Sequence, residues 1–340
     1  MKRTILYVVL AFIVAPIFVS CYQSHKKKLD LAYALVESRP DSALALMKHI
    51  DQEGLSKEEM AKYALTYYIA QDKSGLDLDN DSLIRIAYDW YEGHQEDSLY
   101  VLCLNYMGKF YLLVDSMEQA KSCLEKAYFI SDSLHKMNVK RLVLDKLIEV
   151  EEQLEPYKAL RYAKDMLKMY DSMANVTIYN KVAARLRLGE NFFYVGSLQH
   201  ALEEERKAYR MAMKAGDSNL LSYVRQNLAS TFEEMGEKDS CLYYARLAYD
   251  LNAANRFSCL LTFASAYISV DSLNQAFSLL NQAMPKTAED RYSVFYFQSQ
   301  AAMKAHDFKS AKSFSDSAYH YLEDMYRTAL QGKAAYYTSF

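Results

Sequence analysis

Carboxylates that follow one another directly are the first groups in this sequence that suggest catalysis. Glu203, Glu204 and Glu205 form one such run, and Glu233 and Glu234 form another. Two carboxyl groups can serve as general acid and general base when both face the same bound molecule. Neighbours on a helix point in different directions, because only residues three or four apart share a face. The spacing therefore favours a solvated helix surface over a catalytic pair.

The patterns that bind metals and nucleotides are missing from the sequence. Seven histidines occur without an HExxH motif and without a carboxylate at metal-ligand spacing. Nine glycines are spread singly, so no glycine-rich loop can cradle a phosphate group with its backbone N–H groups. We therefore expect no catalytic residue, no bound metal and no cofactor, which means that the chain is not an enzyme.

Small residues recur at a fixed spacing and indicate the elements that hold any binding surface. Gly108 is followed by Tyr111 at +3, Ala120 at +12, Leu124 at +16 and Ala127 at +19. The same frame starts again at four further positions, namely Gly189, Ala229, Ala264 and Ser299. Small residues at the start and at +12 describe two antiparallel helices whose backbones approach closely. The spacing predicts a series of helical hairpins.

This pattern resembles the tetratricopeptide repeat, which asks for small residues at these offsets with an aromatic residue between them. The resemblance implies an all-α solenoid in which antiparallel helix pairs stack into a right-handed superhelix. Glu205 and Ser315 depart from it, since an apolar residue is usual at their offset. Besides the five clear copies, which cover about 101–320, further helix pairs are expected at 140–154 with 159–169, at 29–37 with 41–50, and at 57–70 with 82–91.

The dipeptide Asp-Ser recurs along the chain and is expected to mark helix starts. Its aspartates are at positions 41, 81, 97, 115, 132, 171, 217, 239, 271 and 316. Either side chain can accept a hydrogen bond from a first-turn N–H group that has no partner within the helix. We interpret several of these dipeptides as N-caps.

The five cysteines include no CxxC pair. Cys241 occupies a small-residue position where two helices cross, so it is expected to be a buried and inert thiol. Cys103 and Cys123 lie on the two helices of one predicted hairpin, and an oxidising compartment permits a disulfide there. Antiparallel helices seldom bring two Cβ atoms into the geometry of a disulfide, so the pairing stays open at this point.

The N-terminus resembles the leader of a bacterial lipoprotein. Lys2 and Arg3 are cationic, the segment 5–19 is almost wholly apolar, and Ser20 precedes Cys21. The resemblance implies that Cys21 becomes the lipidated N-terminus. Fifteen apolar residues interrupted by Pro16 are too few for the roughly 20 that span a bilayer.

The expected organisation follows from the leader and the repeats. It comprises a signal peptide at 1–20, a polar tether at 21–28, degenerate hairpins at 29–100, the repeat solenoid at 101–322 and a C-terminal capping helix at 323–340. The formal net charge of −3 does not suit a nucleic-acid partner. No acidic cluster follows Cys21, so we expect a chain anchored by lipid in the cell envelope, on the periplasmic side rather than the outer surface.

The resemblance also implies a groove lined by the first helix of each repeat. The residues expected on that face mix aromatic, amide and charged side chains: Asn105, Lys109, Glu190, Tyr194, Tyr223, Gln226, Ser230, Glu233, Tyr296 and Gln300. We expect a protein or peptide partner there. The basic and asparagine residues that some family members use to grip a carboxylate terminus are suggested only by Asn105 and Lys109, so that activity is not predicted.

Three functions remain open at this stage. The first is a lipid-anchored, non-enzymatic scaffold that binds a protein or peptide. The second is the sensory part of a tetratricopeptide-type transcriptional regulator that is truncated before its membrane helix. The third is a glycan-capturing lipoprotein, for which Trp90 is the only tryptophan available to stack on a sugar.

Overall fold

The computed structural model describes residues 26–338 except 77, 79, 80, 95–97, 135, 136 and 252. Within that part of the chain every regular element is a helix, and no β-strand occurs. The predicted all-α class is therefore confirmed. The expected signal peptide and Cys21 lie outside the described residues. Residues 26–28, which were expected to belong to the tether, are already helical.

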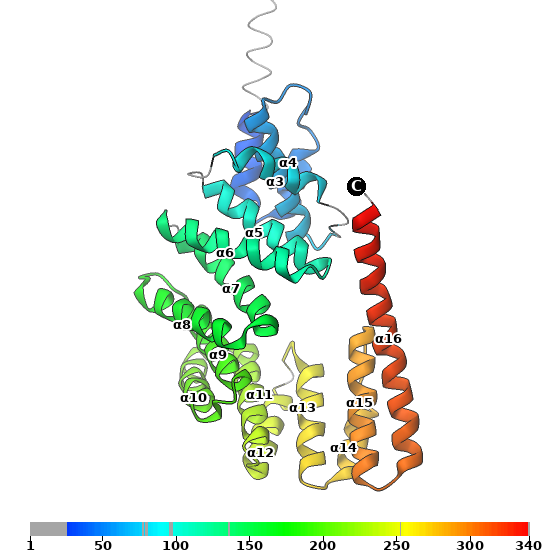
Figure 1. Ribbon diagram of the computed structural model, residues 1–340. Coiled ribbons are helices and arrows are strands. Elements are labelled where there is room, and N and C mark those ends of the chain that lie inside the picture. The colour runs from blue at the N-terminus through cyan, green and yellow to red at the C-terminus, as the bar shows by residue number, and fades with distance from the viewer. Residues whose placement is uncertain are drawn as a thin grey trace, which may run out of the picture. The chain divides into compact units, whose positions relative to one another are not determined.

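The chain divides into two compact units, Met1–Lys146 and Leu147–Phe340, and the division falls inside α7 (Met137–Leu154). The first described helix of the first unit covers residues 26–35. It continues with α2 (Pro40–Met47), α3 (Lys57–Lys73), α4 (Ser82–Tyr91), α5 (Ser98–Leu113) and α6 (Met117–Ser133). Successive helices pack together here, as α3 does with α4 and α5 with α6 (Figure 1).

The second unit holds the longer run of hairpins. After α7 come α8 (Pro156–Ser172), α9 (Ile178–Tyr194), α10 (Leu198–Ala215), α11 (Ser218–Glu234), α12 (Lys238–Tyr249), α13 (Arg256–Ser269), α14 (Leu273–Leu280), α15 (Ala288–Lys304) and α16 (Phe308–Thr338). The pairs α9 with α10, α11 with α12, α13 with α14 and α15 with α16 are four of the five clearly predicted hairpins, and α5 with α6 is the fifth (Figure 1). The first helices of successive pairs also contact each other, as α9 does with α11, α11 with α13 and α13 with α15.

The small residues lie where the repeat requires them. Ala229 and Cys241 are fully buried in one hairpin, as are Ala264 and Ala276 in the next. Cys241 is a free thiol, so its predicted burial is confirmed, and burial raises its pKa to about 12, which fits an inert role. Cys103 and Cys123 are also free thiols.

The turn inside each hairpin has one backbone conformation at one offset. The residue seven positions after the start of each frame has a positive φ of 53° to 76°, and these residues are Asp115, Gly196, Gly236, Asp271 and His306. Glycine enters this left-handed region without strain, and aspartate tolerates it better than most residues. The tight turn therefore favours residue types such as glycine and aspartate, which the helices on either side do not favour.

The Asp-Ser dipeptides have mixed roles. The Asp217 carboxylate accepts a hydrogen bond from the Leu220 N–H group at 3.0 Å, so the predicted N-cap is confirmed there. It is wrong at 115–116 and 271–272, where the aspartate forms the turn and the serine makes no side-chain cap. Asp316 lies in the middle of α16.

The C-terminal helix differs from the expected boundary. One helix, α16, spans 31 residues where the second helix of the last hairpin and a separate capping helix were expected. No proline interrupts its sequence. Ion pairs between residues four apart support it, such as Lys312 with Asp316 at 2.7 Å.

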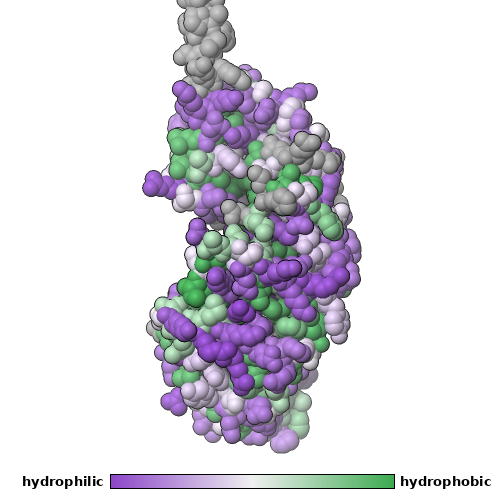
Figure 2. Space-filling model, turned by 90° about the vertical axis from the view of Figure 1, so that its left-hand side faces the viewer, coloured by the Kyte–Doolittle hydropathy of each residue, from purple (hydrophilic) through white to green (hydrophobic). Residues whose placement is uncertain are grey.

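The surface of the described chain mixes polar and apolar side chains. On the face in Figure 2, hydrophilic and hydrophobic residues alternate in small patches. Among the described helices, none has a stretch long and apolar enough to cross a bilayer.

Close helix contact at Gly108 gives the first prediction. A Cβ atom at this position would lie 2.6 Å from the Cγ atom of Leu124, whose side chain is fully buried. We expect Gly108→Ala to lower the free energy of unfolding by about 1–2 kcal/mol, because overpacking outweighs the better helix propensity of alanine. Thermal and urea unfolding followed by circular dichroism measure this.

Gly54 provides the matched control, since no atom lies within 4 Å of a Cβ placed there. The change Gly54→Ala should alter the free energy of unfolding by less than about 0.5 kcal/mol. Equal stability of the two variants would contradict the close contact between α5 and α6.

Candidate functional site

The predicted groove residues belong to two separate units. Asn105 and Lys109 lie on α5 of the first unit. The other eight lie in the second unit, on α9, α11 and α15. We use the name first-helix face for the surface that α9, α11, α13 and α15 form as first helices of successive hairpins in the second unit.

The two residues in the first unit are held within that unit. Lys109 forms an ion pair with Asp72 of α3, and this pair ties the first helices of two neighbouring hairpins together. Asn105 is buried. The ion pair of Lys109 and the burial of Asn105 assign the two side chains to the packing of α5.

Polar residues of the first-helix face connect one hairpin to the next. The Asn227 amide donates to the Glu190 carboxylate at 2.9 Å, which joins α11 to α9. The Ser265 hydroxyl donates to the Glu233 carboxylate at 2.7 Å, which joins α13 to α11. Gln226 takes the same role toward α13, because its carbonyl accepts from Asn255 at 3.0 Å. The predicted groove residues Glu190, Gln226 and Glu233 therefore form hydrogen bonds between neighbouring first helices, and we call these hydrogen bonds braces.

Three tyrosines of the predicted set are exposed. Tyr194 on α9 is 57% exposed, Tyr223 on α11 is 46% exposed and Tyr296 on α15 is 43% exposed. Gln300 is exposed on α15 as well, and Ser230 is half-buried on α11. Exposed tyrosine rings on a braced helix scaffold provide apolar contact area together with a polar tip, which suits a protein partner.

A pocket of about 260 Å³ opens between α9, α10 and α11. Its lining combines three predicted residues with four that the spacing did not indicate: Glu190, Tyr194 and Ser230, and Phe193, Glu205, Asn227 and Thr231. We call it the α9–α11 pocket. It brings two carboxylates and two aromatic rings to one place on the first-helix face.

Glu205 is the residue that most distinguishes this pocket. It comes from the second helix α10 and is only 1% exposed. The Thr231 hydroxyl donates to one carboxylate oxygen at 2.8 Å. Burial raises the pKa of Glu205 to about 7; the hydrogen bond from Thr231 lowers it, and the nearby charge of Glu190 raises it further.

The absence of a side chain at Gly189 makes room for Glu205. A Cβ atom at Gly189 would lie 3.1 Å from the Cγ atom of Glu205. Gly108 faces Leu124 at the same offset of sixteen residues. A glycine at the start of the frame therefore accompanies a long side chain at +16. The departure of Glu205 from the apolar pattern was visible in the sequence, but its position in a pocket was not.

More carboxylates surround this pocket than cations. Glu152 of α7 accepts a hydrogen bond from Asn191 at 2.8 Å, and burial raises the pKa of its carboxyl group. Arg187 lies 3.5 Å from Glu152 and 3.7 Å from Glu190. Burial also raises the pKa of Glu233, which accepts from Ser265 of α13 and does not line this pocket.

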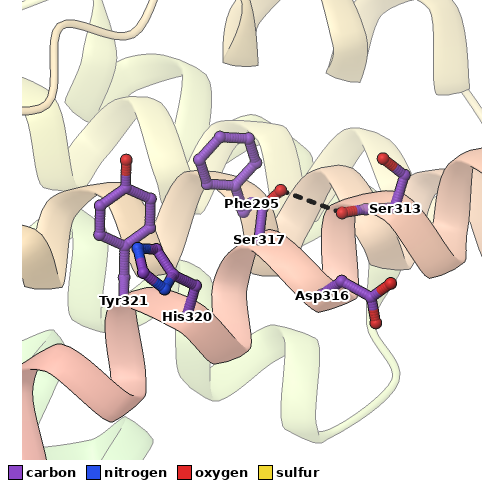
Figure 3. Close-up of a pocket in the computed structure, with 6 residues that line it drawn as sticks. All are labelled: Phe295, Ser313, Asp316, Ser317, His320 and Tyr321. Atoms are coloured by element: carbon purple, nitrogen blue, oxygen red, sulfur yellow. Dashed lines mark hydrogen bonds between the residues drawn. The ribbon is translucent and has the colours of Figure 1, made fainter.

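A second hollow, between α15 and α16, contains serine, aspartate and histidine side chains (Figure 3). Its volume is about 400 Å³. The Ser317 hydroxyl donates to the Ser313 backbone carbonyl at 3.0 Å, and the His320 ring lies 3.7 Å from Asp324. Asp316 points away from His320 (Figure 3). A nucleophile and its base need a hydrogen bond to each other, whereas this hydroxyl and this imidazole each have another partner.

Metal ligands are not gathered in the described part of the chain. No group of three histidine, cysteine, aspartate or glutamate side chains comes together there as a metal ion would require.

Solved structures define the fold. The apo form of RapI is similar to this chain with a TM-score of 0.67 at 14% identity, covering 88% of this chain and 86% of that one. A Rap protein complexed with Competence and Sporulation Factor has a TM-score of 0.60 at 14% identity, covering 91% of this chain and 99% of that one.

A third similar structure is a signal transduction ATPase with numerous domains from Pyrococcus horikoshii, which has a tetratricopeptide repeat sensor. Its TM-score is 0.61 at 13% identity, and the match covers 90% of this chain but only 47% of that one. No family model and no curated protein matches the chain. The predicted all-α tetratricopeptide repeat fold is confirmed by these likenesses and by the packed helix pairs.

The buried carboxyl group of Glu205 predicts a pH-dependent stability. Its folded pKa of about 7 is above the ordinary value of 4.5, so the folded chain holds this proton more tightly than the unfolded chain. The folding stability that this tighter proton binding contributes is fully present below pH 4.5 and is lost as the pH rises through 7. The difference corresponds to about 3 kcal/mol. We expect Glu205→Gln to remove this loss, so that its stability relative to the original chain increases between pH 5 and pH 8.5.

Urea unfolding at a series of pH values measures this difference. Glu203 is exposed on the same helix, so Glu203→Gln removes the same charge without burial and should leave the pH profile unchanged. A Glu205→Gln profile parallel to that of the original chain would show that the carboxyl group titrates normally.

Proposed function

We propose that this chain is a non-enzymatic scaffold that binds a protein or peptide on the first-helix face and is anchored by lipid at Cys21 in the bacterial cell envelope. The observation that carries the binding role is the combination of exposed tyrosines with hydrogen bonds that join their helices to the neighbouring first helices. Tyr194 and Tyr223 are exposed, while Glu190 and Glu233 fasten their helices to the neighbouring first helices. A surface that is rigid before binding loses less conformational entropy when a partner binds.

The similar structures support a binding role. The Rap protein in one of them is complexed with Competence and Sporulation Factor, and this chain matches almost the whole of that protein. Stacked helical hairpins give each repeat one face for a partner, so a long partner segment can be bound over several repeats.

The lipid anchor rests on the sequence. Ser20 before Cys21, after an apolar segment and a cationic start, is the pattern of a lipoprotein leader. We propose the periplasmic side, because no acidic cluster of the kind associated with transfer to the outer surface follows Cys21. Lys26, Lys27 and Lys28 suit contact with anionic headgroups.

A sensory role is the second candidate. The repeats of the Pyrococcus horikoshii protein are a sensor, and a groove that binds a partner can report its presence to a further domain. A glycan-binding role has weaker support, because Trp90 stacks on His94 of its own chain segment with ring centres 4.5 Å apart.

Replacement of the exposed tyrosines tests the partner surface. We expect Tyr194→Ala combined with Tyr223→Ala to reduce capture of the partner at least tenfold, since each change removes a large contact area from the first-helix face. Capture is measured by photo-crosslinking in intact cells from a benzoylphenylalanine at position 194, 223 or 296, followed by mass spectrometry.

Tyr243 is the matched control, because it is 59% exposed but lies on the second helix α12. A crosslinker at position 243 should not capture that partner, and Tyr243→Ala should change its capture less than twofold. The same capture from position 243 as from position 194 would argue against the first-helix face.

Replacement of the lipidated cysteine tests the anchor. We expect Cys21→Ser to abolish incorporation of labelled palmitate and to move the chain from the membrane fraction to the soluble fraction, because no acyl chain can then attach. If the original chain incorporated no labelled palmitate, this result would contradict lipidation.

A further inference from the structure

We infer that the α9–α11 pocket binds the ammonium group of a lysine side chain that the partner presents. This inference rests on the proposed partner-binding function and names the chemistry by which one part of the partner is recognised.

The first argument is an acceptor without a donor. One oxygen of Glu205 accepts from Thr231, but the other is buried and has no hydrogen-bond partner within the described chain. A buried polar atom without a partner costs on the order of 1–3 kcal/mol. The carboxylate lines a pocket on the surface expected to meet the partner, so a donor supplied from outside can satisfy it.

The second argument is the charge around the pocket. Glu190 lies in the same lining, and its charge raises the pKa of Glu205. Burial raises the pKa of the Tyr194 hydroxyl, and the charges of Glu152 and Glu190 raise it further, while Arg187 lowers it. The nearby cation Arg187 is already placed between Glu152 and Glu190. The raised pKa of Glu205 fits a carboxyl group whose charge is not compensated by a cation of this chain.

The third argument is the aromatic wall. Phe193 and Tyr194 line the pocket beside the two carboxylates. An aromatic ring attracts a cation placed over its face and also covers the apolar stem that carries it. The volume of about 260 Å³ exceeds that of several water molecules at roughly 30 Å³ each, which leaves room for the end of a lysine side chain.

The hydrogen bond from Thr231 favours lysine over arginine. A guanidinium group binds best when both oxygens of a carboxylate are free to accept its parallel N–H groups. One oxygen of Glu205 is already occupied, so only a single contact remains. A compact ammonium group can donate to that oxygen and direct its other N–H groups to Glu190 and to the Ser230 hydroxyl oxygen.

Titration of the full-length chain with Nα-acetyl-lysine N-methylamide, followed by nuclear magnetic resonance, tests this inference. We expect saturable binding to the original chain and at least tenfold weaker binding to Glu205→Gln, which keeps the acceptor for Thr231 but loses the charge. Glu203→Gln is the matched control and should bind as the original chain does. The corresponding arginine derivative and the Nε-acetylated lysine derivative should each bind at least fivefold more weakly than lysine.

Equal binding to Glu205→Gln, or equal binding of the arginine derivative, would overturn the inference. Circular dichroism verifies that each variant is folded. If Glu205→Gln does not fold, Glu190→Gln replaces it, with a loss of at least threefold expected and an unchanged affinity counting against the pocket. Failure here can be told apart from failure of the proposed function, because photo-crosslinking from position 194 would still capture the partner when only the lysine site is wrong.

Discussion

The close approach of paired helices at small residues is the contact on which the rest of the structure depends. Gly108 lies against Leu124, and Ala229 and Cys241 are fully buried within one hairpin. Two backbones can come this near only where side chains are small, and the approach lets the larger side chains around them interlock. Each hairpin has apolar surface left over, which it buries against the next hairpin. This arrangement places the first helices side by side, so that they share one face.

The same geometry explains why a charged residue can be buried beside a binding surface. Gly189 leaves room for Glu205, whose carboxylate reaches from α10 to Thr231 on α11. Burial raises the pKa of Glu205, and one hydrogen bond from Thr231 reduces the cost of burying its carboxylate. Neighbouring first helices are braced by the pairs Asn227 with Glu190 and Ser265 with Glu233. The face is thus fixed by polar contacts, while exposed tyrosines remain available to a partner.

The hairpins of the second unit were predictable because their periodic small residues leave few alternative packings. The expected helices at 140–154 and 159–169 correspond to α7 and α8, which are longer by only a few residues at their ends. The Asp-Ser dipeptides were predicted less well, because the choice between an N-cap and a left-handed turn depends on the backbone angle at that residue. The length of α16 was also missed, because no proline in the sequence marks whether the last helix ends with its hairpin or continues beyond it.

The sequence by itself determined the fold class, the offsets at which helices cross and the absence of any motif for metal or phosphate binding. Those properties follow from residue types at fixed spacing, which act through local propensity and periodic packing. Only the tertiary structure decided which groove residues are braces and which are exposed, and it alone placed Glu205 in a pocket with Glu190 and Thr231. Hydrogen bonds between residues about 25 to 40 positions apart depend on how successive hairpins are rotated against each other, and no single repeat contains that information.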